Sequence, residues 1–250
     1  MVTTQQKTST IKALFMGQTD LRTGLWFPIK KMTWKYINGE YLDCVTRFTV
    51  GAQKLQSMYP NDPYLITFGS LERVRVARNL SSCSFANRMP VNRPVEPQML
   101  EVLGLDPNSP VDPVEYVSRS GGYRHGDNND LFPEVRADEN GNYNFYFRPV
   151  SSYQFASLTK PDLNSVVKGD RVRAIIGESK TKLQCQSEII GSTPGYINEL
   201  IKQYQDALEI TIEKVNRNVP VEYQFLCKAR LDNLKGKPFS EMEYQPIIAR

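Results

Sequence analysis

The chain has 250 residues, 40% of them hydrophobic and including 11 Phe and 13 Tyr, which is enough for one large domain or two small ones. It contains no run of eighteen apolar residues, and its first ten residues lack the basic and apolar regions of a signal peptide. The sequence therefore excludes a membrane-spanning helix and predicts a cytoplasmic protein.

His125 is the only histidine, so histidine-dependent catalysis must be built around this residue. The four cysteines form no C-x-x-C pair, which argues against zinc or dithiol sites and predicts buried, idle thiols.

The net charge of +4 conceals a segregation of charge along the chain. Residues 71–94 hold five Arg against one Glu, whereas residues 95–150 hold four Arg against ten acidic residues. Segregation of this kind says more about partners than the total charge does. The sequence predicts a basic stripe beside an acidic one.

The first part of the chain predicts an antiparallel β meander. Between residues 11 and 50, runs rich in aromatic and β-branched residues are separated by "TDLRTG" and "INGE", which contain the Gly with Asp or Asn that hairpin turns require. The segment "VGAQKLQSM" predicts one or two helical turns, and the prolines of "YPNDPY" stop a helix after it. Residues 71–89 fit a helix by the spacing of Leu71, Val74 and Ala77, and a strand by the alternation in "RVRVAR". The local pattern leaves this segment open.

Two short helices are predicted in the acidic segment. The first begins near Pro97 and ends at Gly104. The second has Asp112 as its N-cap and Pro113 at its first helical position, and Gly121 follows its end.

The remaining chain predicts a second unit rich in β-structure. An Asn-Gly turn in "ADENGNYNFYFRPV" precedes an alternating aromatic strand, and "DLNSVVKGDRVRAII" joins a Lys-Gly-Asp turn to another strand. The segment "TPGYINELIKQYQDA" predicts a helix that starts at Thr193 and Pro194 and has Tyr196 on its apolar face, followed by two strands. We therefore expect an α+β protein with a mixed β/α domain at residues 1–148 and a β-rich domain at residues 149–250.

The densest group of reactive residues lies in one predicted loop, "RSGGYRHGDNNDLFPE". Its candidate residues are Arg119, Gly121, Gly122, Arg124, His125 and Asp127. Paired glycines permit close backbone approach, arginine binds carboxylate or phosphate, and His125 with Asp127 could form an acid/base pair. Together with Asp130 and Glu134, this loop could support a metal-dependent nuclease or other hydrolase. The alternative is a turn fixed by Arg–Asp pairs, and the chain contains no common nucleotide-binding or hydrolase motif.

Two basic sets of residues are candidates for binding nucleic acid. The first is an arginine stripe that consists of Arg73, Arg75, Arg78, Arg88 and Arg93. The second follows a predicted strand into the helix after it and consists of Lys168, Arg171, Arg173, Lys180, Lys182 and Tyr196. Basic side chains contact phosphates, and aromatic rings stack on bases. The alternative for the arginine stripe is a set of solvated or glutamate-paired arginines, and Glu178 and Glu188 weaken the case for the second set.

Several motifs spread along the chain resemble bacterial proteins that contain a HIRAN domain. They include "LWFPIKKMTW", "FANR", "LEVLGLD", "DPVEYVSRSGG" and "LFPEV", then "VVKGDRVRAI", "IIGSTPGYINELI", "ITIEKVN" and "FSEMEYQPI". Residues 71–135 are also similar to the N-terminal subdomain of HipA-type kinases. The resemblance implies a non-catalytic HipA-like platform followed by a small HIRAN-like β-barrel with one helix. Because HIRAN domains bind single-stranded DNA at a 3′ end, it also implies a role connected with DNA.

The chain departs from the HIRAN pattern at the ligand loop. After "RVRAIIGE", the acidic, proline-rich loop of the family is replaced by "SKTKLQCQ". The tyrosine and aspartate that read a DNA end in that loop have no counterpart, so recognition of a 3′ end is not implied. Lys180 and Lys182 in the altered loop could still contact backbone phosphates.

Three functional hypotheses follow. The first is a non-catalytic, DNA-associated accessory subunit of a bacterial defence, toxin–antitoxin or mobile-element system, which works in a protein complex and needs no metal or other cofactor. The second is a protein–protein adaptor whose acidic segment, residues 95–150, docks a basic partner without binding nucleic acid. The third is the metal-dependent hydrolase with His125 at its centre.

Overall fold

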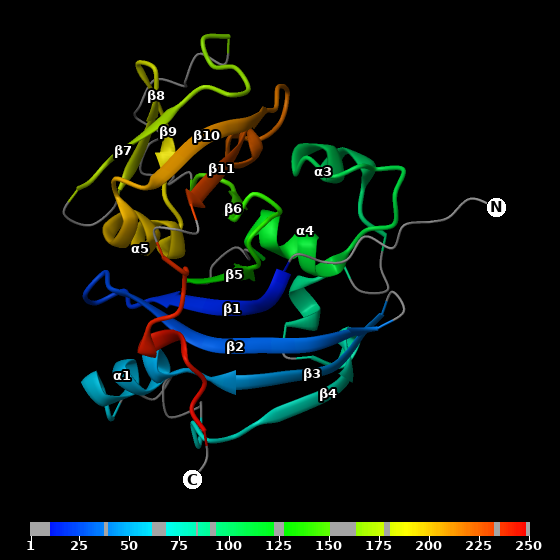
Figure 1. Cartoon of the computed structure of the whole chain (residues 1–250), viewed down its shortest axis with the longest axis vertical. Helices are drawn as coiled ribbons and strands as arrows, with labels where there is room; N and C mark the ends of the chain where they lie inside the picture. Colours follow the sequence, from blue (N-terminus) through cyan, green and yellow to red (C-terminus); the bar gives the residue numbers. More distant parts are fainter. Residues whose placement is uncertain are drawn as a thin grey trace.

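The fold belongs to the α+β class, with mostly antiparallel strands in three sheets (Figure 1). The computed structural model describes residues 11–37, 40–61, 69–83, 85–90, 94–122, 128–150, 164–177, 181–232 and 236–248. Within these ranges, no helix is long and apolar enough to cross a membrane. In Figure 1 the five-stranded sheet occupies the lower half of the molecule, and the two smaller sheets lie above it.

The five-stranded sheet has the order β4-β3-β2-β1-β5. Its strands are β1 (Ile11–Thr19), β2 (Trp26–Ile37), β3 (Glu40–Phe48), β4 (Arg75–Asn79) and β5 (Asn129–Val135). The strands β1, β2 and β3 pair antiparallel in chain order, which confirms the predicted meander. The turn from β1 to β2 is held by the buried Asp20, whose carboxylate accepts hydrogen bonds from Arg22 Nε at 2.9 Å, Thr23 Oγ1 at 2.6 Å and the Tyr59 hydroxyl at 2.9 Å.

The segment at residues 71–89, which fits both a helix and a strand, contains the edge strand β4 at Arg75–Asn79. Cys44 of β3 pairs with Ala77, and this pairing buries Ala77 while its neighbours in β4 stay exposed. The side-chain oxygen of Asn79 accepts a hydrogen bond from the Ser82 N–H at 3.1 Å, where the strand gives way to a 3₁₀ helix. The strand pattern is therefore correct for residues 75–79, because pairing with a distant strand outweighs the local helical spacing.

Four α-helices accompany the sheets in the described part of the chain: α1 (Val50–Met58), α3 (Pro97–Val102), α4 (Pro113–Ser120) and α5 (Gly195–Tyr204). The start of α4 is as predicted, because Asp112 Oδ1 accepts hydrogen bonds from the N–H groups of Val114 at 2.8 Å and Glu115 at 3.2 Å. The helix ends at Gly121, whose φ of 73° lies in the left-handed region that glycine adopts at little cost.

The rest of the chain forms two three-stranded antiparallel sheets, with the orders β10-β11-β6 and β7-β8-β9. Their strands are β6 (Asn142–Phe147), β7 (Val172–Ile175), β8 (Lys182–Cys185), β9 (Glu188–Ser192), β10 (Leu208–Val215) and β11 (Phe225–Asp232). Isolated bridges join the two sheets at Arg171–Thr211 and Val150–Ser192. The predicted strands and the single helix are present, but no closed barrel is detected in the described ranges.

Strand pairing crosses the predicted domain boundary at residue 148 in both directions. β6, which precedes the boundary, pairs with β11 of the second unit. The C-terminal residues return to the first sheet, where Pro246 forms a bridge with Thr49 and the Ile247 N–H donates to the Phe48 carbonyl at 2.9 Å. The division into residues 1–148 and 149–250 stays a prediction, and the sheets on its two sides share segments of chain.

An aromatic cluster fills the region where the sheets meet. Phe132 of β5 is fully buried, and its ring centroid lies 5.1 Å from that of Phe15, 5.0 Å from that of Tyr196 and 5.0 Å from that of Phe239. The rings of Phe132 and Tyr196 are stacked with an interplanar angle of 12°. Because these residues come from β1, β5, α5 and the C-terminal segment, the cluster joins the first sheet to the rest of the molecule.

Trp26 forms a second contact between the five-stranded sheet and helix α5. Its indole ring lies against Gly17 of β1 and Gly195 of α5, and a Cβ atom at either glycine would overlap the ring. The indole Nε1 donates a hydrogen bond to Asp130 Oδ1 of β5 at 3.1 Å. The two glycines are therefore required by close packing around one side chain.

The four cysteines are free and buried, as predicted. Burial raises the pKa of Cys44 to about 12, and the neighbouring Cys83 and Asp43 add to this effect. Burial likewise raises the pKa of Cys185 to about 11, with Asp170 as a further cause. Thiols in such surroundings stay protonated and unreactive at neutral pH.

Candidate nucleic-acid interface

Two residues of the second basic set, Arg171 and Arg173, line a groove between β7, β10 and α5. The groove has a volume of about 510 Å³. Its lining combines two arginines with an apolar wall and consists of Arg171, Val172, Arg173, Ala174, Ile176, Ile201, Gln205, Asp206, Leu208 and Ile210. Arg171 and Arg173 thus lie side by side with residues that follow them by about thirty positions in the sequence.

The alternation of β7 explains why the two arginines are exposed. Val172 is only 5% exposed and packs into the core, so its neighbours Arg171 and Arg173 point to the opposite side of the strand. The antiparallel register places Arg173 opposite Gln184 and Ile175 opposite Lys182, which brings a third cation to the same face. Within the described residues, neither Arg171 nor Arg173 has an ion-pair partner, although Asp206 lies at the groove.

The other members of this set lie elsewhere. Lys168 is exposed, and its Nζ forms an ion pair with Glu213 Oε1 at 2.8 Å. The hydrogen bond to Glu213 raises the pKa of Lys168, so its charge is already matched within the protein. Lys180 falls outside the described residues.

Tyr196 is not on this surface. It is 1% exposed, is stacked on Phe132 in the aromatic cluster, and its pKa is raised by burial and by the nearby Asp130. No base can reach this ring in the folded protein. The signal for its burial is present in the sequence, because Tyr196 shares the apolar face of α5 with Ile197, Leu200 and Ile201.

The arginine stripe divides into two groups. Arg73, Arg75 and Arg78 are exposed at or next to the edge strand β4. Arg88 is partly buried, and its Nη1 donates hydrogen bonds to the carbonyl oxygens of Gly122 at 3.1 Å and Asn129 at 3.4 Å. Arg88 therefore ties the 3₁₀ helix at Ala86–Arg88 to the chain after α4 and to the start of β5, and Arg93 falls outside the described residues.

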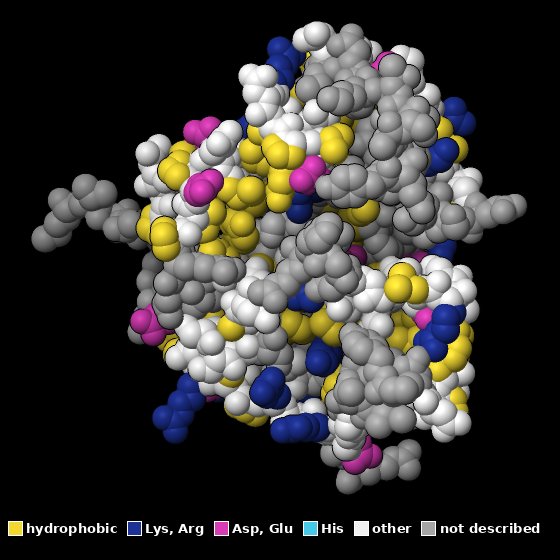
Figure 2. Space-filling model, turned by 180° about the vertical axis from the view of Figure 1, so that it is seen from behind, with side chains coloured by type: hydrophobic (Ala, Val, Ile, Leu, Met, Phe, Trp, Pro, Cys, Tyr) yellow, Lys and Arg dark blue, Asp and Glu magenta, His cyan; other side chains and the backbone are white. Residues whose placement is uncertain are grey.

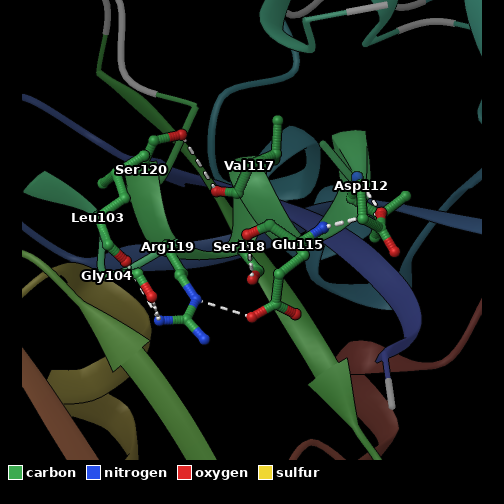
Figure 3. A network of polar contacts seen from close by, with 9 residues as sticks. Leu103, Gly104, Asp112, Glu115, Val117, Ser118, Arg119 and Ser120 are labelled. Carbon is green, nitrogen blue, oxygen red and sulfur yellow. Dashed lines mark hydrogen bonds and ion pairs between the residues drawn. The ribbon is translucent and has the colours of Figure 1, made fainter. Parts of the chain in front are cut away.

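The predicted functional loop is only partly described, and Arg124, His125 and Asp127 fall outside the described residues. Arg119 has a structural role, because its Nε forms an ion pair with Glu115 Oε1 at 2.7 Å and its Nη1 donates to the carbonyl oxygens of Leu103 at 3.1 Å and Gly104 at 3.3 Å (Figure 3). Its guanidinium group also lies 4.1 Å from the centroid of the Tyr146 ring. Arg119 thus fastens the end of α3 to α4 and β6.

The two glycines of this loop have separate structural roles. Gly121 ends α4, as described above. Gly122 has a φ of 57°, and a Cβ atom there would approach Leu131 Cδ1 to 2.8 Å. This glycine allows the backbone at residue 122 to lie close to Leu131 of β5.

Asp130 and Glu134 do not form a shared metal site. They are four positions apart on β5, which corresponds to about 13 Å along a strand, whereas the ligands of one ion lie within a few ångströms of it. Asp130 accepts the hydrogen bond from Trp26, and the buried Glu134 forms an ion pair with Lys31 Nζ at 2.8 Å. Within the described residues, no group of three or more possible ligands is close enough to hold a metal ion.

The sequence analysis missed the wall of the groove that faces the arginines. Ile201, Gln205, Leu208 and Ile210 come from the end of α5 and the start of β10, and no local pattern connects them with β7. The residues that meet at the groove therefore depend on the packing of one sheet edge against a helix.

A comparison with models of known protein families, with curated proteins and with solved structures found no match to this chain.

Proposed function

We propose that the protein is a non-catalytic, DNA-associated binding subunit that holds a single nucleic-acid strand in the groove between β7, α5 and β10. The observation that carries this proposal is the pair of exposed arginines, Arg171 and Arg173, beside an apolar wall. Guanidinium groups bind phosphate oxygens, and apolar side chains such as Ile176 and Leu208 accommodate the faces of bases or sugars. The groove volume of about 510 Å³ is within the usual range of ligand sites, roughly 300 to 1,000 Å³.

A single strand suits this surface better than a duplex. The cations are confined to β7 and the facing position of β8, so they match a short stretch of one phosphate backbone. If Arg171 and Arg173 each neutralise one phosphate, the logarithm of the binding constant falls with the logarithm of the salt concentration with a slope of about −1.4. This slope distinguishes the groove from a broader basic surface, which gives a steeper dependence.

The resemblance to HIRAN domains supports the same conclusion. The second and third sheets are linked at both pairs of edges, by the bridges Arg171–Thr211 and Val150–Ser192. We propose that they form an incompletely hydrogen-bonded version of the HIRAN barrel, with the groove beside one of the bridges. The first sheet with its short helices then serves as the platform that connects this unit to other subunits of a bacterial defence, toxin–antitoxin or mobile-element complex.

The test is fluorescence anisotropy with labelled single-stranded and duplex DNA, with free or blocked 3′ ends, over a series of salt concentrations. We expect single-stranded DNA to bind with the slope given above, and the double variant Arg171→Glu with Arg173→Glu to lose at least about tenfold in affinity. Arg217→Glu is the matched control, because Arg217 is exposed beyond the far end of β10, about 23 Å along the strand from Ile210.

Equal affinity of the groove variant and the control would remove the groove from the proposal. Absence of any binding at low salt would favour the adaptor, whose partner would then co-purify in stoichiometric amounts after nuclease treatment. Cleavage of the labelled DNA in the presence of Mg²⁺ or Mn²⁺ would instead favour the hydrolase.

A further inference from the structure

The outer edge of β4 is a second surface that the proposed groove does not use. β4 lies at the end of the five-stranded sheet and, in the described part of the chain, pairs only with β3. Every second N–H and C=O group of such a strand points away from the sheet and is available to another strand. Four of its five residues are exposed, and Ala77 alone is buried.

The side chains on this edge are of two kinds. Arg75 and Arg78 are exposed within the strand, and Arg73 is exposed just before it. Val74 and Val76 are 41% and 66% exposed. Charged residues on an edge commonly protect it from unwanted pairing, but the exposed β-branched residues Val76 in the strand and Val74 just before it do the opposite, because such residues favour the addition of a strand.

The arginines of this edge, Arg73, Arg75 and Arg78, form no ion pair in the described part of the chain. Acidic residues are nevertheless close, because the exposed Glu72 precedes Arg73, and Asp43 of β3, which is paired with Lys35, lies opposite Arg78 in the register. Burial lowers the pKa of Lys30, and the charge of Arg75 lowers it further, so a second cation lies close to the strand. Figure 2 shows Lys and Arg side chains gathered over the lower part of the rear face, at the level of the five-stranded sheet in Figure 1.

We propose that the outer edge of β4 binds an acidic, extended segment of a partner protein, which adds to the sheet as a sixth strand. The alternation of a strand places Arg75 on one face of the sheet and Arg78 on the other. A phosphate backbone that crosses one face meets only one of them. A strand added along the edge has side chains on both faces and meets both arginines.

The register of β4 specifies the partner segment. The residues opposite Arg78 and Arg75 are acidic, the residue opposite Val76 is β-branched, and the residue opposite Ala77 is small or polar. Read antiparallel to β4, this gives an acidic residue, a small or polar residue, a β-branched residue and a second acidic residue. The acidic side chains of such a segment pair with Arg75 and Arg78, and its β-branched side chain packs on Val76. Its backbone forms the hydrogen bonds that add it to β4.

The experiment uses the full chain and the capped peptide Thr-Glu-Thr-Val-Glu-Thr, with amide hydrogen exchange and anisotropy as measurements. We expect slower exchange of the amides of residues 75–79 in the presence of the peptide. The double variant Arg75→Glu with Arg78→Glu should bind it about 5- to 10-fold more weakly, because two exposed ion pairs are lost. The same variant should regain affinity for a peptide with Lys in place of both Glu residues.

Two controls separate strand addition from other kinds of binding. A peptide with the same side chains but N-methylated at alternate amides keeps its charges and lacks the N–H groups that would donate to β4. It should therefore not slow the amide exchange of residues 75–79. Equal binding of the methylated peptide would overturn the proposal. A loss of single-stranded DNA binding in the β4 variant as large as that in the groove variant would also overturn it, since β4 would then belong to a nucleic-acid surface. The groove proposal is tested by its own variants and does not depend on this result.

Discussion

Replacement of Phe132 by alanine tests whether the aromatic cluster joins the three sheets into one cooperative unit. Phe132 is fully buried and contacts Phe15, Tyr196 and Phe239 with ring centroids 5.0 to 5.1 Å apart. Loss of a buried phenylalanine costs about 3 to 5 kcal/mol, a range that already includes its ring contacts, and the three close aromatic pairs place Phe132 in the upper part of this range. We therefore expect Phe132→Ala to lower the free energy of unfolding by about 4 to 5 kcal/mol, a large part of the roughly 5 to 15 kcal/mol typical of a folded protein.

The assay is urea unfolding followed by tryptophan fluorescence and by far-ultraviolet circular dichroism. Trp26 and Trp34 both belong to β2, and Trp26 also packs against Gly195 of α5, so fluorescence reports on the first sheet and on its contact with α5. Circular dichroism reports on all three sheets. We expect one transition by both probes in the wild-type protein and the same shift of both in the variant. Phe132→Leu is the control, with an expected loss of about 1 to 2 kcal/mol that keeps the protein folded. Two separate transitions of which only one moves would refute the reasoning, because the cluster would then stabilise one sheet alone.

Three further predictions concern individual side chains. Although burial raises the pKa of Asp20, hydrogen bonds from Thr23, Arg22 and Tyr59 lower it to about 2 from its ordinary 3.8. Because the pKa is depressed in the folded state, Asp20 contributes about 2 kcal/mol that is present above pH 5 and is lost as the pH falls through about 2. Urea unfolding of the wild type and Asp20→Asn should therefore differ at pH 7 and converge at pH 2, and a constant difference would contradict the assignment. The pKa values of the Cys44 and Cys185 thiols are raised to about 12 and about 11, so the native protein should react slowly with a thiol reagent at pH 8. Unfolding in urea should expose all four thiols to the reagent. Rapid labelling of the native protein would contradict their burial. Arg119→Ala should cost about 1 to 3 kcal/mol, because the carbonyl groups of Leu103 and Gly104 lose their donor and the Tyr146 ring loses the guanidinium packed on it. Arg119→Lys should not restore the full loss, because lysine lacks the planar group that donates to both carbonyls while it lies over Tyr146.

Local chemistry predicted most of the secondary structure. The Asp112 cap, Pro113 and Gly121 define α4 because each of them acts on backbone groups within a few residues. The same holds for the turn at Gly141, with a φ of 81°, and for the turn at Gly169, with a φ of 92°. The segment at residues 71–89 could not be assigned in this way, since the burial of Ala77 depends on pairing with Cys44.

The candidate site was predicted less completely than the fold. The charge pattern identified Arg171, Arg173 and Lys182 as exposed cations, and they are exposed in the structure. It also included Tyr196, Arg88 and Arg119, which the structure places in the core or against backbone carbonyls. The sequence states that a side chain is basic or aromatic, but the direction in which it points depends on the elements packed around it.

The sequence by itself determined the α+β class, the meander, the helix caps and the burial of the thiols, because these follow from composition and from contacts between near neighbours. Only the tertiary structure decided that β6 joins β11, that the C-terminal residues return to Thr49 and Phe48, and that α5 and β10 face Arg171 and Arg173 across a groove. The physical reason is the same in each case. These contacts join residues far apart in the chain, and they form where buried apolar surface and strand pairing are satisfied together, which no local pattern specifies.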